Sequence, residues 1–157
     1  YQFVSRDVFE GLVAHGELIE HAEVHGNYYG TPKDPLRRAI AQRQIMLLVI
    51  DVAGGERLKK QELDALLVFL LPPDQSELMR RLQGRGTEDV KQQTVRLRAA
   101  EIEMHRAKAT YHHLLVNEEL QKCIEDVDTL VQTAREKLHD RLEAGEQLYP
   151  GLKPQPE

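Results

Sequence analysis

The sequence predicts an α/β fold in which a mostly parallel sheet is flanked by helices. Two continuous apolar runs, residues 45–50 and 66–71, have the pattern of strands buried on both faces of such a sheet. A shorter apolar run at 114–116 predicts a third strand, and the alternating segment 17–24, followed by turn residues at 26–30, predicts a strand or two with a tight turn. Strands that alternate with helical stretches are typical of parallel α/β proteins.

The helices are predicted from apolar periodicity and from the residues at their ends. Ser5 is a good N-cap for a helix over 6–15, and Gly16 supplies its C-terminal stop. Pro32 and Pro35 suit the opening of a helix that runs to about residue 43. Further helices are predicted over 56–63, 76–83, 88–110 and 119–142.

Composition excludes several classes of protein. The chain has 157 residues, the size of one domain, and its net charge of −5 argues against a protein that coats nucleic acid. No apolar run is long enough to span a bilayer, so we expect no membrane segment and a cytoplasmic protein. The single Cys123 excludes an internal disulfide framework, and no Cys/His spacing predicts a metal site. Nothing in the sequence indicates an oligomeric state.

Polar residues at the ends of the predicted strands are the first candidates for a ligand site. Asp51, Asp74 and Asn117 follow the three apolar runs, and open α/β sheets bind ligands at the carboxyl ends of their strands. For Asp51 the alternative is a structural cap on the following turn or helix.

A cluster of arginines surrounds the glycine-rich segment 82–87. In an acidic protein such a cluster can bind a polyphosphate, because the planar guanidinium pairs with phosphate oxygens. The alternative is a solvated helix face, and the spacing favours neither. The arginines are Arg80, Arg81, Arg85, Arg96 and Arg98, and the acidic partners of the alternative are Glu88, Asp89 and Glu101.

A series of short motifs resembles the guanylate kinases in content and in order. The most specific is GNYYGTP at 26–32. The others are YQFVS at 1–5, ELIE at 17–20, IDV at 50–52, PP at 72–73, GRGTE at 84–88, RL at 96–97 and VNEEL at 116–120. The match runs from residue 1 to about residue 138, and it implies the P-loop type of parallel sheet with a GMP-binding region and a lid.

The resemblance implies an ATP-dependent transfer of phosphate to GMP, with GMP-binding residues in the first part of the chain. Glu20 matches the carboxylate that accepts hydrogen bonds from N1 and the amino group of guanine. Thr31 matches a hydroxyl that contacts the base, and Asp51 matches an acid that holds it. Tyr1 and Tyr29 match the tyrosines that reach the GMP phosphate.

The resemblance also implies catalytic arginines and the cofactors ATP and Mg²⁺. Arg81, Arg85 and Arg96 match arginines that neutralise the transferring phosphoryl group. Arg85 and Asn117 are the candidates for contact with ATP, and no protein ligand for the metal is predicted. The domain would cover 1–143, divided into a GMP-binding region at 1–32, core at 33–75, lid at 76–98 and core at 99–143, with a flexible tail at 144–157.

Two departures from the family pattern qualify this expectation. Val49 occupies a position where the family has an aspartate, and the 157 residues contain no G-x-x-x-x-G-K-[ST] loop. Since the chain also starts at Tyr1 without a methionine, we expect an N-terminally truncated copy. Without the family's central strand, one edge of 45–50 and one edge of 66–71 would face a gap. We therefore predict that this chain alone folds poorly or aggregates through those edges, binds GMP weakly at best and has no kinase activity.

Two other functions stay open from the sequence. An inactive guanylate-kinase-like module would use the GMP cleft for a phosphorylated or acidic peptide, which the missing loop and Val49 favour. The intact GRGT segment at 84–87 argues against it. A purely structural role for the apolar stripe of helix 119–142 is weaker, because that stripe has the pattern of ordinary core.

Overall fold

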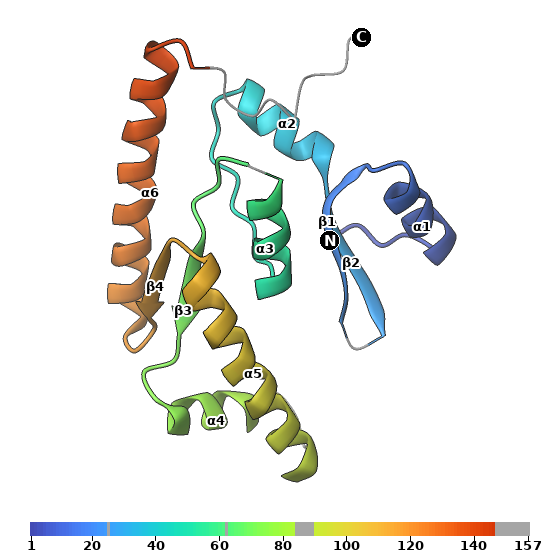
Figure 1. The fold of residues 1–157 in the computed structure, drawn as a ribbon, viewed down its shortest axis with the longest axis vertical. Helices are drawn as coiled ribbons and strands as arrows, with labels where there is room; N and C mark the ends of the chain where they lie inside the picture. Colours follow the sequence, from blue (N-terminus) through green and yellow to red (C-terminus); the bar gives the residue numbers. More distant parts are fainter. Residues whose placement is uncertain (25, 62, 84–89, 147–157) are drawn as a thin grey trace. The chain divides into compact units, whose positions relative to one another are not determined.

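The computed structural model in Figure 1 describes residues 1–24, 26–61, 63–83 and 90–146. The described chain forms two compact units, one over Tyr1–Ala65 and one over Leu66–Glu146. The first contains α1 (Arg6–Ala14), β1 (Leu18–Val24), β2 (Asn27–Pro32), α2 (Lys33–Ala41) and α3 (Val52–Lys60). The second contains β3 (Val68–Leu71), α4 (Gln75–Gln83), α5 (Val90–Thr110), β4 (His113–Val116) and α6 (Leu120–Glu143).

An antiparallel hairpin of β1 and β2 is the centre of the first unit. Ala22 pairs with Tyr29 and Glu20 pairs with Thr31, and the register shifts between Leu18 and Glu20. The predicted tight turn between two strands is therefore confirmed. The core beside the hairpin is small and apolar, with buried side chains of Phe9, Leu18, Ile19, Val52 and Leu58.

The first helix begins and ends where its capping residues predict. The Ser5 hydroxyl accepts a hydrogen bond from the Val8 amide at 3.4 Å, and Gly16 adopts a φ of 66°, which glycine tolerates without strain. The sequence thus defines α1 through local chemistry alone.

Helix α3 begins earlier than its apolar pattern predicts. The Asp51 carboxylate accepts a hydrogen bond from the Gly54 amide at 2.7 Å and so caps the first turn. This cap and the packing of α3 against β1 outweigh the low helix propensity of Gly54 and Gly55, both of which are buried. The helix spans Val52–Lys60 instead of 56–63.

The prediction of a buried strand at residues 45–50 is wrong. No described strand pairs with this segment. Its alternate side chains point to solvent, and Ile45, Leu47 and Val49 are 58%, 78% and 90% exposed. The physical reason is that a strand exists only through hydrogen bonds to a neighbour, which an apolar pattern cannot supply.

The second unit contains the parallel strand pair that the sequence predicts. Strand β3 pairs with β4 in parallel, with Val68 opposite His113 and Leu71 opposite Val116. The Leu67 amide donates to His112 Nδ1 at 3.0 Å just before β3 begins. Helix α4 contacts α5, helix α6 contacts β4, and the buried apolar side chains are Leu67, Ala107 and Cys123.

The predicted α/β class is confirmed. The described strands form two separate two-stranded sheets, β1 with β2 and β3 with β4, instead of one larger sheet. The helices predicted at 76–83, 88–110 and 119–142 correspond to α4, α5 and α6 within a few residues. Most of the predicted flexible tail lies outside the described residues.

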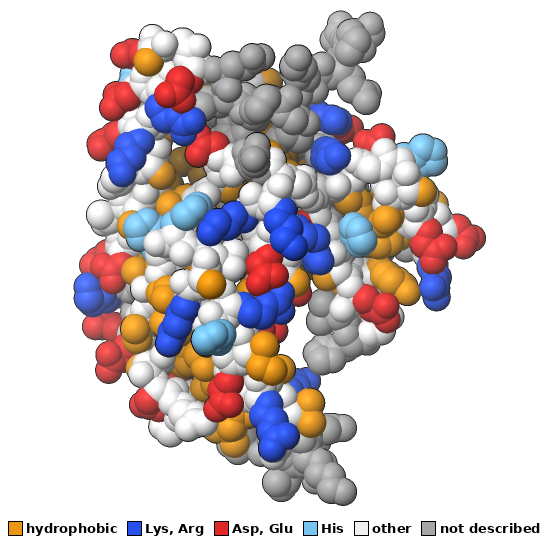
Figure 2. Space-filling model, viewed as in Figure 1, with side chains coloured by type: hydrophobic (Ala, Val, Ile, Leu, Met, Phe, Trp, Pro, Cys, Tyr) orange, Lys and Arg blue, Asp and Glu red, His pale blue; other side chains and the backbone are white. Residues whose placement is uncertain are grey.

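Apolar side chains occur among charged ones on the face that Figure 2 shows. The large exposed hydrophobic residues include Tyr1, Phe3, Leu47 and Val49. In the described part of the chain, no helix combines the length and the apolar character that crossing a bilayer requires.

Candidate functional site

The hairpin places Glu20 and Thr31 in direct contact. They are cross-strand partners, and the Thr31 hydroxyl donates to Glu20 Oε1 at 2.7 Å. The Glu20 residue is only 6% exposed, which is unusual for a carboxylate and is sustained by this hydrogen bond. Its other oxygen, Oε2, receives no hydrogen bond from the described residues.

Tyr29 lies on the same face of the hairpin as this pair. Residues two apart on a strand point to the same side, so Tyr29 and Thr31 share a face with their partners Ala22 and Glu20. The ring of Tyr1 packs edge-on against Tyr29, with centroids 6.1 Å apart. The structure therefore brings together four of the five residues that the resemblance assigns to GMP.

Asp51, the fifth residue, lies at the N-terminal end of α3 and caps that helix. The capping role that the sequence left open is thus present. Helix α3, which Asp51 caps, packs against the strand that carries Glu20.

Arg57 is a residue of this site that the sequence did not indicate. It lies on α3, and its Nη2 is 3.9 Å from Glu20 Oε2. Nothing in the local sequence predicts this proximity, because the two residues are far apart along the chain and meet only through the packing of α3 on β1.

The second unit organises one of the predicted catalytic arginines. Arg81 donates from Nε to Glu77 Oε1 at 2.6 Å and from Nη2 to the Asn117 carbonyl at 2.8 Å. Arg81 and Asn117, which the sequence predicted for phosphate and ATP, therefore lie together at the end of β4. Glu77 also pairs with Arg80, so part of the cluster is a paired helix face, with Glu77 as its acid.

Hydrogen bonds from Arg80 and Arg81 lower the pKa of the Glu77 carboxyl from an ordinary 4.5 to about 2. A carboxyl with a lowered folded-state pKa contributes stability above its unfolded pKa, and that contribution is lost as pH falls from 4.5 through about 2. In a pH titration followed by carboxyl NMR, we expect Glu77 to titrate near the lower value and to shift upward in Arg80→Ala.

The matched control is Arg98→Ala, which removes an exposed arginine from α5 and should leave the Glu77 midpoint unchanged. A wild-type midpoint near 4.5 would contradict the ion pairs, because that is the ordinary value for an unpaired glutamate.

The structure gives less information on the other two arginines that were predicted to be catalytic. Arg85 lies outside the described residues. Arg96 lies on α5, where it is half-buried and has an interaction partner. The remaining arginine of the described cluster, Arg98, is exposed on the same helix.

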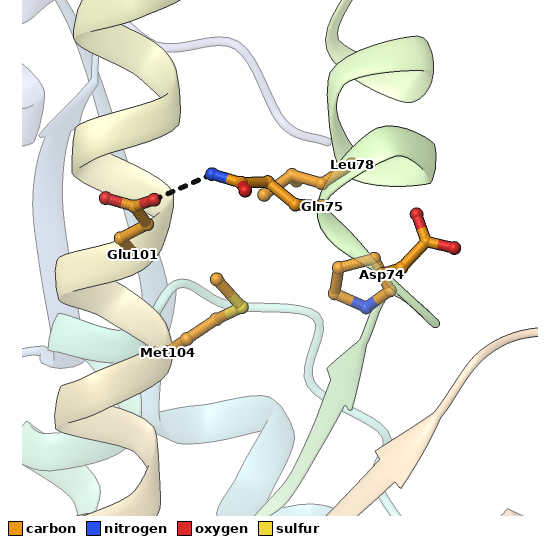
Figure 3. Close-up of a pocket in the computed structure, with 6 residues that line it drawn as sticks. Asp74, Gln75, Leu78, Glu101 and Met104 are labelled. Atoms are coloured by element: carbon orange, nitrogen blue, oxygen red, sulfur yellow. Dashed lines mark hydrogen bonds between the residues drawn. The ribbon is translucent and has the colours of Figure 1, made fainter.

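A hollow of about 250 Å³ lies beside the start of α4, between α4 and α5 (Figure 3). Within it the Gln75 side-chain amide donates to Glu101 Oε1 at 3.0 Å. Asp74 caps α4 through bonds from the Ser76 hydroxyl and the Glu77 amide, which lower the pKa of the Asp74 carboxyl. Asp74, Gln75 and Glu101 thus make hydrogen bonds within the protein. None of the residues predicted to bind a nucleotide lines the hollow.

Comparison with known proteins decides the family. The guanylate kinase family model matches residues 1–134, which is most of the chain. The chain belongs to the guanylate kinase family. This family member is 40% identical over 132 residues to the guanylate kinase of Leifsonia xyli, an alignment that covers 83% of this chain and 52% of the relative.

The alignments with other relatives cover a larger share of the relative's length. The guanylate kinase of Myxococcus xanthus is 35% identical, over 86% of this chain and 65% of its own. That of Listeria innocua is 35% identical, over 97% of this chain and 74% of its own. The chain therefore spans between about half and three quarters of the length of these curated relatives.

A solved structure supports the same assignment. The crystal structure of guanylate kinase from Anaplasma phagocytophilum matches with a TM-score of 0.71 and 31% sequence identity. The match covers 86% of this chain and 65% of that one. The fold and the sequence motifs thus identify the same family.

Proposed function

We propose that this chain is the GMP-binding and lid part of an enzyme that transfers a phosphoryl group from ATP to GMP and forms GDP. The observation that carries the proposal is the buried Glu20 carboxylate, which accepts from Thr31 at 2.7 Å and whose second oxygen accepts no hydrogen bond from the described residues. The proposed setting is purine nucleotide metabolism in the cytoplasm. The names of the relatives give no support to an inactive peptide-binding module.

The Glu20 carboxylate suits guanine because it can only accept hydrogen bonds. Guanine presents two adjacent donors, N1–H and the 2-amino group, to an acceptor at this position. Adenine presents the N1 lone pair there, so a buried carboxylate facing adenine would lose its partner and be repelled by that lone pair. One acidic side chain therefore selects guanine over adenine.

The phosphate of GMP is proposed to lie near the tyrosines. Tyr1 and Tyr29 are partly or fully exposed, and their rings pack together beside the Glu20 face of the hairpin. Their hydroxyl groups can donate to phosphate oxygens when GMP binds with its base at Glu20. Asp51, on the helix that packs against β1, is proposed to assist in holding the base.

Arginines of the second unit are proposed to neutralise the transferring phosphoryl group. Arg81 is held between Glu77 and the Asn117 carbonyl, which fixes the orientation of its guanidinium. Arg85 and Arg96 are proposed for the same work, and Arg85 and Asn117 for contact with ATP. Phosphoryl transfer needs mainly positioning and positive charge, which such arginines supply.

ATP and Mg²⁺ are the cofactors that membership of the family implies. Among the described residues, no group of three His, Cys, Asp or Glu side chains is arranged to hold a metal ion. Val49, at the position of the family's additional acid, is 90% exposed and offers no ligand. The described side chains therefore do not fit a protein-held metal.

Calorimetric titration of the 157-residue chain with GMP and with AMP tests the proposal. We expect weak but saturable binding of GMP and no heat of binding with AMP at the same concentrations, because only guanine satisfies Glu20. Equal binding of the two nucleotides, or no binding of either, would refute it.

A further inference from the structure

Two side-chain nitrogens of Arg57 lack a hydrogen-bond acceptor within the described part of the chain. Its Nε and Nη2 atoms are shielded from solvent and make no hydrogen bond to any described residue. Glu20 Oε2 lies 3.9 Å from Nη2, beyond hydrogen-bond distance. Arg37, the other described arginine with a shielded unpaired nitrogen, is anchored to Asp34 at 2.8 Å.

Shielded guanidinium donors without an acceptor are unfavourable, because they have lost their hydrogen bonds to water and formed none within the protein. Protein interiors rarely keep such groups unless a ligand or water completes them. The unpaired atoms lie next to the Glu20 carboxylate, so a ligand bound by Glu20 would lie close to them.

Glu20 and Arg57 together form an acceptor beside a donor. Glu20 Oε2 accepts, and the neighbouring Arg57 nitrogens donate. The complementary ligand edge has a donor beside a carbonyl oxygen, which is the N1–H and C6=O arrangement of a purine lactam. Adenine has the reverse order, with an acceptor at N1 and an amino group at position 6.

We propose that Arg57 donates a hydrogen bond to the 6-carbonyl oxygen of the purine base and so acts as a second specificity residue. The inference rests on the proposed function, because it requires guanine to be the ligand of Glu20. Glu20 accepts hydrogen bonds from the donors of the base, N1–H and the 2-amino group, and Arg57 donates to its acceptor, the 6-carbonyl oxygen. A base with an amino group at position 6 would then be opposed by a carboxylate and by a guanidinium together.

A simpler role for Arg57 makes a different prediction. If its charge serves only to hold Glu20 ionised and in place, removal of Arg57 weakens every ligand of Glu20 by the same factor. If Arg57 contacts the base, removal weakens only ligands that have a good acceptor at position 6. A ligand altered at that one atom separates these roles.

The test uses GMP and 6-thio-GMP, in which sulfur, a weak acceptor, replaces the 6-oxygen while N1–H and the 2-amino group stay. Affinities are measured by calorimetry for the 157-residue chain, for Arg57→Met and for Lys60→Met. Arg57→Met keeps an apolar stem and removes the donors. Lys60→Met removes one positive charge from an exposed position of the same helix and is the matched control.

We expect wild type to prefer GMP over 6-thio-GMP by about tenfold or more, the usual effect of a hydrogen bond to a charged group. In Arg57→Met this preference should fall close to one, through loss of GMP affinity alone, and in Lys60→Met it should persist. A preference that survives in Arg57→Met, or is absent from wild type, overturns the inference.

Three further outcomes are interpretable. If circular dichroism shows that Arg57→Met is unfolded, Arg57→Lys replaces it, and a preference as large as that of wild type counts against a contact from the planar guanidinium. If wild type binds GMP but shows no preference, only the Arg57 assignment fails. If wild type binds no GMP, the proposed function fails as well.

Discussion

Replacing Glu20 with glutamine is expected to weaken GMP binding by about 100-fold. A carboxylate that accepts from two guanine donors makes two charge-assisted hydrogen bonds, each of which contributes about 1.5–3 kcal/mol. Glutamine keeps the oxygen that Thr31 contacts and replaces the other oxygen with an amino group, a donor that faces a donor of guanine. Calorimetric titration of wild type and Glu20→Gln with GMP measures the difference.

Glutamine is preferred to alanine here because the fold should tolerate it. Its side-chain oxygen can still accept the hydrogen bond that Thr31 donates at 2.7 Å, so the hairpin keeps its cross-strand contact. Glu20→Ala would leave the Thr31 hydroxyl without its acceptor and would mix a stability effect with the binding effect.

Glu23→Gln is the matched control for the loss of charge. Glu23 lies on the same strand, is exposed, and points to the opposite face of the hairpin because it is an odd number of residues from Glu20. We expect GMP affinity within about twofold of wild type in this variant, as for most surface substitutions away from a site. Unchanged affinity in Glu20→Gln would remove the basis of the guanine assignment.

Replacing Gly30 with alanine is expected to destabilise the first unit by about 1–3 kcal/mol, the usual cost of overpacking. A Cβ at this position would lie 2.7 Å from Leu18 Cδ1, 3.2 Å from the Glu20 carbonyl and 3.3 Å from His21 Cβ. Leu18 is buried and cannot simply swing aside, and the other two contacts are to the backbone and to a Cβ, which hardly move.

Gly11→Ala is the opposite case and serves as the control for Gly30→Ala. Gly11 lies within α1, and a Cβ there would meet nothing within 4 Å. Alanine favours the helix by about 1 kcal/mol over glycine, so this variant should be more stable than wild type. Urea denaturation of wild type, Gly30→Ala and Gly11→Ala measures the expected loss and the expected gain in the free energy of unfolding. A Gly30→Ala chain as stable as Gly11→Ala would contradict the close packing of the hairpin.

Gly30 links stability to function, because the atoms that it would displace belong to the strand that carries Glu20. A shift of the Glu20 carbonyl would also move its carboxylate relative to Thr31. We therefore expect Gly30→Ala to weaken GMP binding as well, whereas Gly11→Ala should leave it unchanged.

The sequence by itself determined the kinds of local structure and the family. Ser5 and Gly16 define α1 through a cap and a left-handed glycine, both of which depend on immediate neighbours. The turn between β1 and β2 and the apolar periodicity of α6 are local in the same sense. The ordered motifs around 26–32 indicated the guanylate kinases, which the comparisons confirm.

The tertiary structure alone decided which of these segments meet. Residues 45–50 have the apolar pattern of a strand and yet form none, because a strand needs hydrogen bonds from a neighbour that its own residues do not specify. Arg57 lies near Glu20 because α3 packs on β1, and Arg81 reaches Asn117 because β3, which precedes α4, pairs with β4. Contacts between distant residues depend on packing and register, which no local pattern encodes.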